Sequence, residues 1–219
     1  MKKQTWFLIL STAFIVILLT CNLMATKQIL VLGFVLTAGA FLYPFNFMLG
    51  DVITEVFGFK KMRQVIILGF ACQLFVSGVC AIGIFLPYPP FFENQEAYVA
   101  IFSFVPRIVA ASLIAYLFGE FFNAKVLDAM RRRFPNHPFW TRTIGSSLVG
   151  QIFDSALFIG IAFFGVVPLD VLFMMIAVQY VVKIGVEATL GTPMAYALRH
   201  LIHKTTKDET LEKLGGTDG

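Results

Sequence analysis

Long apolar runs constrain this chain more than any other feature of its sequence. Of its 219 residues, 58% are hydrophobic and only 14% are charged, whereas a soluble domain carries about 25% charged residues. A helix needs roughly 20 apolar residues to cross about 30 Å of hydrocarbon. Six runs are close to or above that length, so we predict six transmembrane helices, at about residues 6–25, 29–50, 62–86, 104–122, 141–165 and 169–198.

The predicted fold is an all-α integral membrane protein, with six transmembrane helices in a compact bundle. Residues 1–203 are expected to form one transmembrane domain, and residues 204–219 a polar cytoplasmic tail. Small residues recur at four-residue spacing in two of the runs, and such rows let helices approach closely. They are Ala111, Ala115 and Gly119 in the fourth run, and Ser146 and Gly150 in the fifth.

Lysine and arginine residues are concentrated in alternate connections. They precede the first run, follow the second, fourth and sixth runs, and include Lys60, Lys61 and Arg63 after the second. The other connections hold only Lys27. Short cytoplasmic loops carry the excess of basic residues. We therefore predict that both termini are cytoplasmic.

Polar side chains inside the apolar runs are the candidates for a binding site, because burying them in a membrane is costly. Gln151 and Asp154 share one helix face, and so do Gln179, Lys183 and Glu187. The substrate-binding candidates are Asn22, Asn46, Asp51, Arg107, Gln151, Asp154, Gln179, Lys183 and Glu187.

Structural roles stay open for several of these charged residues. Lys183 and Glu187 can form an ion pair within one helix, since intramembrane charges commonly pair. Asp154 lies near the middle of its run, so it needs a partner, which is either the substrate or a salt bridge to Arg107 or Lys183. Arg107 can alternatively extend to the outer headgroups.

Four further polar side chains have a structural explanation of their own. Asp51 and Glu55 can simply reach the headgroup region at the end of their run. Glu120 is expected at the interface for the same reason. Gln73 is expected to form a hydrogen bond between helices.

Several classes of function lack their motifs. The sequence contains no P-loop, no HExxH motif and no His/Cys cluster with ligand spacing. Cys21, Cys72 and Cys80 lie in or beside apolar runs and are expected to pack as small hydrophobic residues. We therefore predict no enzymatic activity, no catalytic residues, no metal and no cofactor. The run RRRFP indicates a topology anchor rather than a nucleic-acid site.

The stretch from Cys21 to Arg63 combines the patterns N-x-x-A-x-K, F/Y-P and D-x-x-x-E-x-x-G with a basic turn. Its matching residues are Asn22, Ala25, Lys27, Tyr43, Pro44, Asp51, Glu55, Gly58, Lys60 and Arg63. With RIVAASLIAYLFGE, GQIFDSALF and YVVKIGVEATLGTPM, this combination resembles the vitamin uptake transporter family of bacterial membrane proteins, whose described members are queuosine precursor transporters. The resemblance covers nearly the whole chain.

The resemblance implies a fold similar to the six-helix substrate-binding subunits of energy-coupling-factor transporters. It also implies import of 7-cyano-7-deazaguanine and 7-aminomethyl-7-deazaguanine across the bacterial inner membrane. Three alternatives stay open: a carrier for another vitamin or nucleobase, a binding subunit that needs an external ATPase module, and an intramembrane enzyme. A homo-oligomer is also left open. The expected partners are the deazapurine and the lipid bilayer, without nucleic acid.

A guanine-like base offers two adjacent N–H donors, which a carboxylate can accept, and a carbonyl acceptor. Asp154 or Glu187 can take the N–H edge. The acceptors can be met by Gln151, Asn22, Lys183 or Arg107, and the candidates for stacking on the base are Phe41, Tyr43, Phe45 and Phe158. A carboxylated vitamin suits Arg107 and Lys183 equally well.

Overall fold

The structure is a computed structural model, and it describes residues 3–133, 139–186, 189, 197–198 and 200–202. Five helical segments in this part of the chain are long and apolar enough to cross a membrane. The prediction of a helical membrane protein is therefore confirmed in its general form.

The elements are α1 (Lys3–Met24), β1 (Gln28–Val31), β2 (Phe34–Thr37), the 3-10 helix η1 (Ala38–Phe41), α2 (Tyr43–Phe57), α3 (Phe59–Phe85), α4 (Gln95–Phe102), α5 (Val105–Arg133), α6 (Phe139–Phe163) and α7 (Leu169–Val186).

The predicted helix over residues 29–50 is wrong. An antiparallel hairpin of β1 and β2 stands there, followed by η1 and by the start of α2. The two turn residues, Leu32 and Gly33, have φ values of 50° and 85°, as a tight two-residue hairpin turn requires. Pro44 lies in the first turn of α2, where its missing N–H does no harm. With 15 residues, α2 is only about 22 Å long at 1.5 Å per residue, shorter than the hydrocarbon layer.

The other runs form helices close to the predicted positions. The structure adds the short helix α4 before α5, and it extends α5 to Arg133. The last predicted run begins as α7 at Leu169, but most of its residues after Val186 lie outside the described part of the chain.

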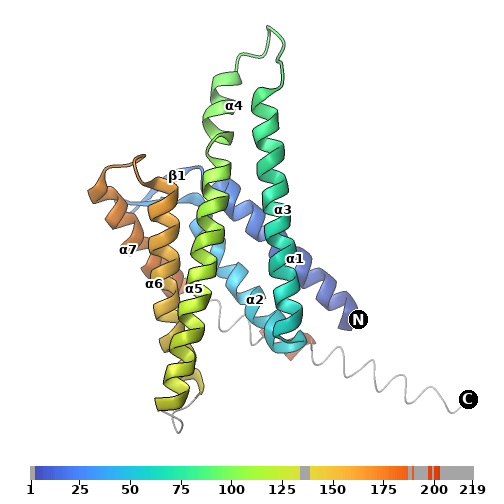
Figure 1. Cartoon of the computed structure of the whole chain (residues 1–219), viewed down its shortest axis with the longest axis vertical. Helices are drawn as coiled ribbons and strands as arrows, with labels where there is room; N and C mark the ends of the chain where they lie inside the picture. Colours follow the sequence, from blue (N-terminus) through green and yellow to red (C-terminus); the bar gives the residue numbers. More distant parts are fainter. Residues whose placement is uncertain (1–2, 134–138, 187–188, 190–196, 199, 203–219) are drawn as a thin grey trace, which may run out of the picture.

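The helices α3, α5 and α6 run along the long axis of the molecule, and α1 and α2 run obliquely to it (Figure 1). The helix α1 packs against α2 and α3, α3 packs against α5, and α5 and α6 make the most extensive contact of any two elements. A Cβ atom added at Gly150 would lie 2.9 Å from the carbonyl oxygen of Gly119 and 2.9 Å from Cβ of Asn123. The small residues Gly119 and Gly150 therefore permit this close packing, as predicted.

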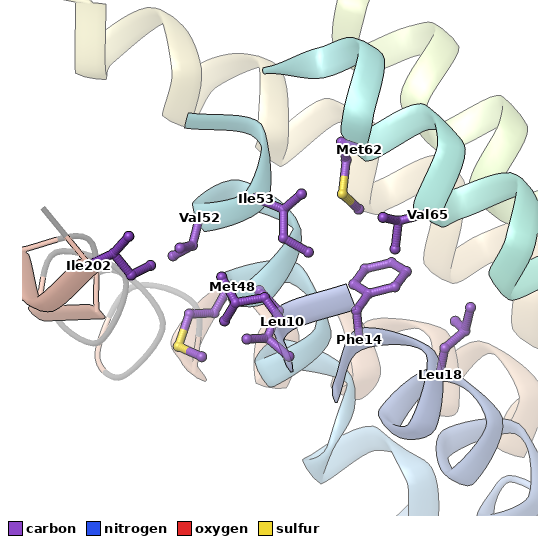
Figure 2. Packing of buried hydrophobic residues seen from close by; sticks show 10 residues of the cluster. Leu10, Phe14, Leu18, Met48, Val52, Ile53, Met62, Val65 and Ile202 are labelled. Atoms are coloured by element: carbon purple, nitrogen blue, oxygen red, sulfur yellow. The ribbon is translucent and has the colours of Figure 1, made fainter. Parts of the chain in front are cut away.

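Two clusters of buried apolar side chains hold the helices together. In the first, Leu10, Phe14 and Leu18 of α1 face residues of α2 and α3, with Ile202 at one edge (Figure 2). The second joins the end of α1 to α5, α6 and α7, and consists of Ala25, Ile108, Ala111, Ile159, Ala162, Phe163, Leu172 and Met175. Outside these clusters large apolar residues such as Phe75 and Ile82 are exposed, as a lipid-facing surface requires.

Candidate functional site

A small cavity of about 20 Å³ lies where the end of α1, the β2–η1 segment, α2, α6 and α7 meet. Its lining combines two amides, one ammonium group and two aromatic rings with small side chains. The lining residues are Cys21, Asn22, Ala25, Thr37, Gly39, Ala40, Tyr43, Phe158, Gln179 and Lys183. The cavity is therefore the point where polar residues from distant parts of the sequence come together.

A buried ion pair lies at this cavity. Lys183 of α7 donates a hydrogen bond to Oδ2 of Asp154 in α6, and both side chains are buried. The hydroxyl group of Tyr43 donates a long hydrogen bond, 3.5 Å, to Oδ1 of Asp154. The ammonium nitrogen of Lys183 lies 4.1 Å from the centre of the Tyr43 ring, within the range of a cation–π interaction. These contacts join α2, α6 and α7.

The pairing decides which charge the cavity presents. Of the two paired residues, only Lys183 lines the cavity. A lysine ammonium group has three N–H donors, and one of them is directed at Asp154. Asp154 therefore neutralises Lys183, and of the two charged groups it is the ammonium group that borders the cavity. The salt-bridge alternative for Asp154 is the one that the structure displays.

The two amides of the cavity have unsatisfied hydrogen-bonding atoms. Asn22 is 5% exposed and Gln179 is 3% exposed. Within the described residues, Nδ2 of Asn22 and Oε1 of Gln179 have no hydrogen-bond partner. A buried polar group without a partner costs about 1–3 kcal/mol. Two residues that line the cavity thus carry one unpartnered donor and one unpartnered acceptor within the described residues.

Arg107 does not line the cavity, and its side chain binds backbone carbonyl groups instead. Its Nε donates to the carbonyl oxygen of Ile161 at 2.8 Å, and its Nη2 donates to that of Phe164 at 2.5 Å. These carbonyl groups lie at the C-terminal end of α6, where helix carbonyls lack intrahelical partners and positive charge is favoured. Arg107 therefore caps α6, instead of snorkelling to headgroups or lining the cavity.

The remaining predicted site residues are dispersed. Asn46 and Gln151 are buried but do not line the cavity. Asp51 is exposed on α2, and Glu187 lies outside the described residues. Among the stacking candidates, Tyr43 and Phe158 line the cavity, whereas Phe41 and Phe45 do not. Outside the cavity, Gln73 donates to the carbonyl oxygen of Leu18 at 3.2 Å, which confirms the predicted bond between helices.

Thr37, Gly39 and Ala40 form a wall of the cavity that the sequence did not predict, because its apolar pattern there indicates a continuous helix. A Cβ atom added at Gly39 would lie 2.3 Å from the carbonyl oxygen of Cys21. Glycine is thus required where η1 approaches α1. A glycine inside an apolar run was the available signal, but packing between helices explains such glycines equally well.

The residues around the cavity include aromatic rings, amides and an ammonium group. Aromatic rings contact flat faces, while the amides and the ammonium group select the polar edges. No group of three or more His, Cys, Asp or Glu residues that can hold a metal ion occurs in the part of the chain that the structure describes.

Comparisons with known proteins agree with one another. The chain is 33% identical over 183 residues to the "Probable queuosine precursor transporter" of Bacillus subtilis (strain 168), covering 83% of this chain and 79% of that protein. It is 27% identical over 204 residues to the "Queuosine precursor transporter" of Escherichia coli (strain K12), covering 92% and 90%. No solved structure matches the chain significantly, so the similarity to energy-coupling-factor subunits stays a prediction. Residues 37–198 match the family described as "Putative vitamin uptake transporter", and the protein therefore belongs to the vitamin uptake transporter family.

Proposed function

We propose that this protein imports queuosine precursors into the cytoplasm and binds them in the cavity between α1, η1, α2, α6 and α7. The names of the relatives in Bacillus subtilis and Escherichia coli support the substrate class. The observation that carries the proposal is the gathering of Asn22, Gln179 and Lys183 around one cavity among membrane helices. The substrates that we propose are 7-cyano-7-deazaguanine and 7-aminomethyl-7-deazaguanine.

The chemistry of the cavity matches a deazaguanine. The rings of Tyr43 and Phe158 are available to contact the flat faces of the base. The donors of Lys183 that do not face Asp154 are available for an acceptor on the base. The amides of Asn22 and Gln179 supply neutral hydrogen bonds, which suit the uncharged ring system that both precursors share better than a second unpaired charge does.

The size of the cavity indicates the state of the transporter. A volume of about 20 Å³ accommodates about one water molecule, whereas pockets for small ligands measure about 300–1,000 Å³. The cavity as it stands therefore has no room for a bicyclic base, and we take this arrangement as a closed form of the transporter. We propose that the walls separate to admit the base from outside and then rearrange to release it inside.

A cell that neither makes nor takes up queuosine precursors provides the test. Expression of this protein, with either deazaguanine in the medium, is expected to restore queuosine in tRNA, measured by mass spectrometry of tRNA digests. A variant at the exposed start of α3, Lys60→Ala, serves as a control for expression. If queuosine stays absent while the protein is present in the membrane, the proposal is wrong.

The same assay separates a solitary transporter from a binding subunit. In a host that lacks energy-coupling ATPase modules, a solitary transporter still restores queuosine. A binding subunit restores it only when such a module is supplied. We expect restoration without the module.

A further inference from the structure

We infer that Asn22 and Gln179 read the lactam edge of the base, with Asn22 as the hydrogen-bond donor and Gln179 as the acceptor. This inference rests on the proposed function of the same cavity and assigns its specificity to two residues. It also assigns the N–H edge to Gln179, whereas the sequence offered the carboxylates of Asp154 or Glu187 for it.

Each of the two amides has one hydrogen-bonding atom without a partner among the described residues. Buried polar atoms in proteins almost always have hydrogen-bond partners. Nδ2 of Asn22 and Oε1 of Gln179 have none among the described residues, although both side chains are at least 95% buried. Both residues line the same cavity and come from different helices, α1 and α7. A ligand that bridges them satisfies both atoms at once.

The unpartnered atoms of the two amides are complementary to the lactam edge of the base. The lactam edge of a guanine-like base carries a carbonyl acceptor beside a ring N–H donor. The carbonyl oxygen accepts from the free N–H of Asn22, and the ring N–H donates to the free oxygen of Gln179. An adenine-like edge carries an amino donor beside a ring nitrogen acceptor, so a donor would face a donor and an acceptor would face an acceptor. The cavity therefore selects a lactam against its amino counterpart.

The nearby carboxylate is already engaged. Asp154 accepts from both Lys183 and Tyr43, and it does not line the cavity. To use Asp154 for the base, the protein would first have to break a buried ion pair, and the loss of a partner leaves a charge unpaired. Gln179 offers an acceptor without that step.

The test uses purified protein in detergent and two probes. The first probe is 7-aminomethyl-7-deazaguanine, and the second is its 6-amino counterpart, which lacks the lactam. The wild type is expected to bind the lactam probe at least tenfold more tightly. Gln179→Met and Asn22→Leu are nearly isosteric and remove one hydrogen bond each, so each is expected to raise the Kd for the lactam probe about ten- to hundredfold.

Gln73→Met is the matched control. Gln73 is also a fully buried glutamine whose Oε1 has no partner among the described residues, but it does not line the cavity. Its substitution removes the bond to Leu18, so it is expected to lower the unfolding temperature and leave the Kd unchanged.

The unfolding temperature separates recognition from a structural role. Gln179→Met removes a buried carbonyl oxygen that has no partner among the described residues and keeps nearly the same shape, which relieves the cost of that unsatisfied acceptor. The ligand-free variant is therefore expected to unfold at the same or a higher temperature, while the stabilisation by the lactam probe is lost. If Asn22→Leu does not reach the membrane, Asn22→Ala removes the same donor without added bulk.

Two results would overturn the inference while leaving the proposed function intact. One is a wild-type Kd for the lactam probe in both cavity variants. The other is equal binding of the two probes by the wild type, which would show that the amides reorient to accept either edge. If the wild type binds neither 7-aminomethyl-7-deazaguanine nor, in the same assay, 7-cyano-7-deazaguanine, the proposed function fails along with the inference.

Discussion

The ion pair of Asp154 and Lys183 is where a single substitution has the largest expected effect. Removing one charge leaves the other buried and unpaired, at a cost of about 3–5 kcal/mol. Asp154→Asn is therefore expected to lower the amount of folded protein in the membrane. The double variant Asp154→Asn with Lys183→Met removes both charges and is expected to restore that amount, but not uptake. Quantitative detection in membranes, with uptake per folded molecule, measures both effects.

The single variant Lys183→Met completes the comparison of the two single variants with the double variant. Like Asp154→Asn, it is expected to express poorly alone, because Asp154 then lacks its cation. If all three variants reach the membrane at the wild-type level, the pair does not stabilise the fold. If the double variant transports normally, Lys183 has no role in binding.

A substitution of Arg107 can show whether this cation stabilises the fold or binds the substrate. Arg107→Lys keeps the charge but loses the geometry that reaches both Ile161 and Phe164. Each hydrogen bond to a charged group contributes about 1.5–3 kcal/mol, so the unfolding temperature is expected to fall. The Kd for the base is expected to stay unchanged. A weaker Kd with an unchanged unfolding temperature would place Arg107 in the binding site.

Much of the candidate site could be anticipated residue by residue. Asn22, Gln179 and Lys183 stood out as polar groups inside apolar runs, and the structure brings them to one cavity. The partner of Lys183 could not be chosen, because that choice depends on how α6 and α7 are rotated against each other. The role of Arg107 was equally hidden, because its acceptors are backbone carbonyl groups at the end of a different helix.

At the scale of elements, the contact between α5 and α6 depends on Gly150. A methyl group there would press against the backbone of Gly119 and against Asn123, so Gly150→Ala is expected to destabilise the protein by about 1–3 kcal/mol. Gly160 of the same helix has no atom within 4 Å of an added Cβ. Gly160→Ala is therefore expected to be neutral or to stabilise by up to about 1 kcal/mol.

Thermal unfolding of the two variants in detergent makes the comparison. Asp154 lies beside this contact, since its Cβ would be 3.1 Å from a Cβ atom added at Gly119. Gly150→Ala should therefore also impair uptake, whereas Gly160→Ala should not. Equal unfolding temperatures for both variants would contradict the packing described for α5 and α6.

The segment between α1 and α2 shows where pattern analysis fails. Its hydropathy is that of a membrane helix, and a run of apolar residues does not distinguish a helix from a pair of strands. The signals for the hairpin were Gly33 in the turn, Pro44 at the start of α2, and the branched residues Ile29, Val31 and Val35, which favour strands. The long helices were predictable because length and hydropathy agree there.

For the whole molecule, the distribution of lysine and arginine predicts which connections lie on the cytoplasmic side. In Figure 1 the α3–α4 and α6–α7 connections lie toward one end of the molecule, and the α2–α3 junction lies toward the other. In a variant without native cysteines, an impermeant thiol reagent added to intact cells is expected to label Glu96→Cys and Val167→Cys. The reagent should label Lys60→Cys only after the membrane has been permeabilised. Labelling of residue 60 in intact cells would contradict a cytoplasmic location of both termini.

A structure of the protein with 7-aminomethyl-7-deazaguanine bound tests the central claim most directly. The account predicts an enlarged cavity with the base against Tyr43 and Phe158, the lactam carbonyl group at Asn22, the ring N–H at Gln179, and Lys183 still paired with Asp154. An ordered base at another place, with the cavity still closed as it is here, would contradict it.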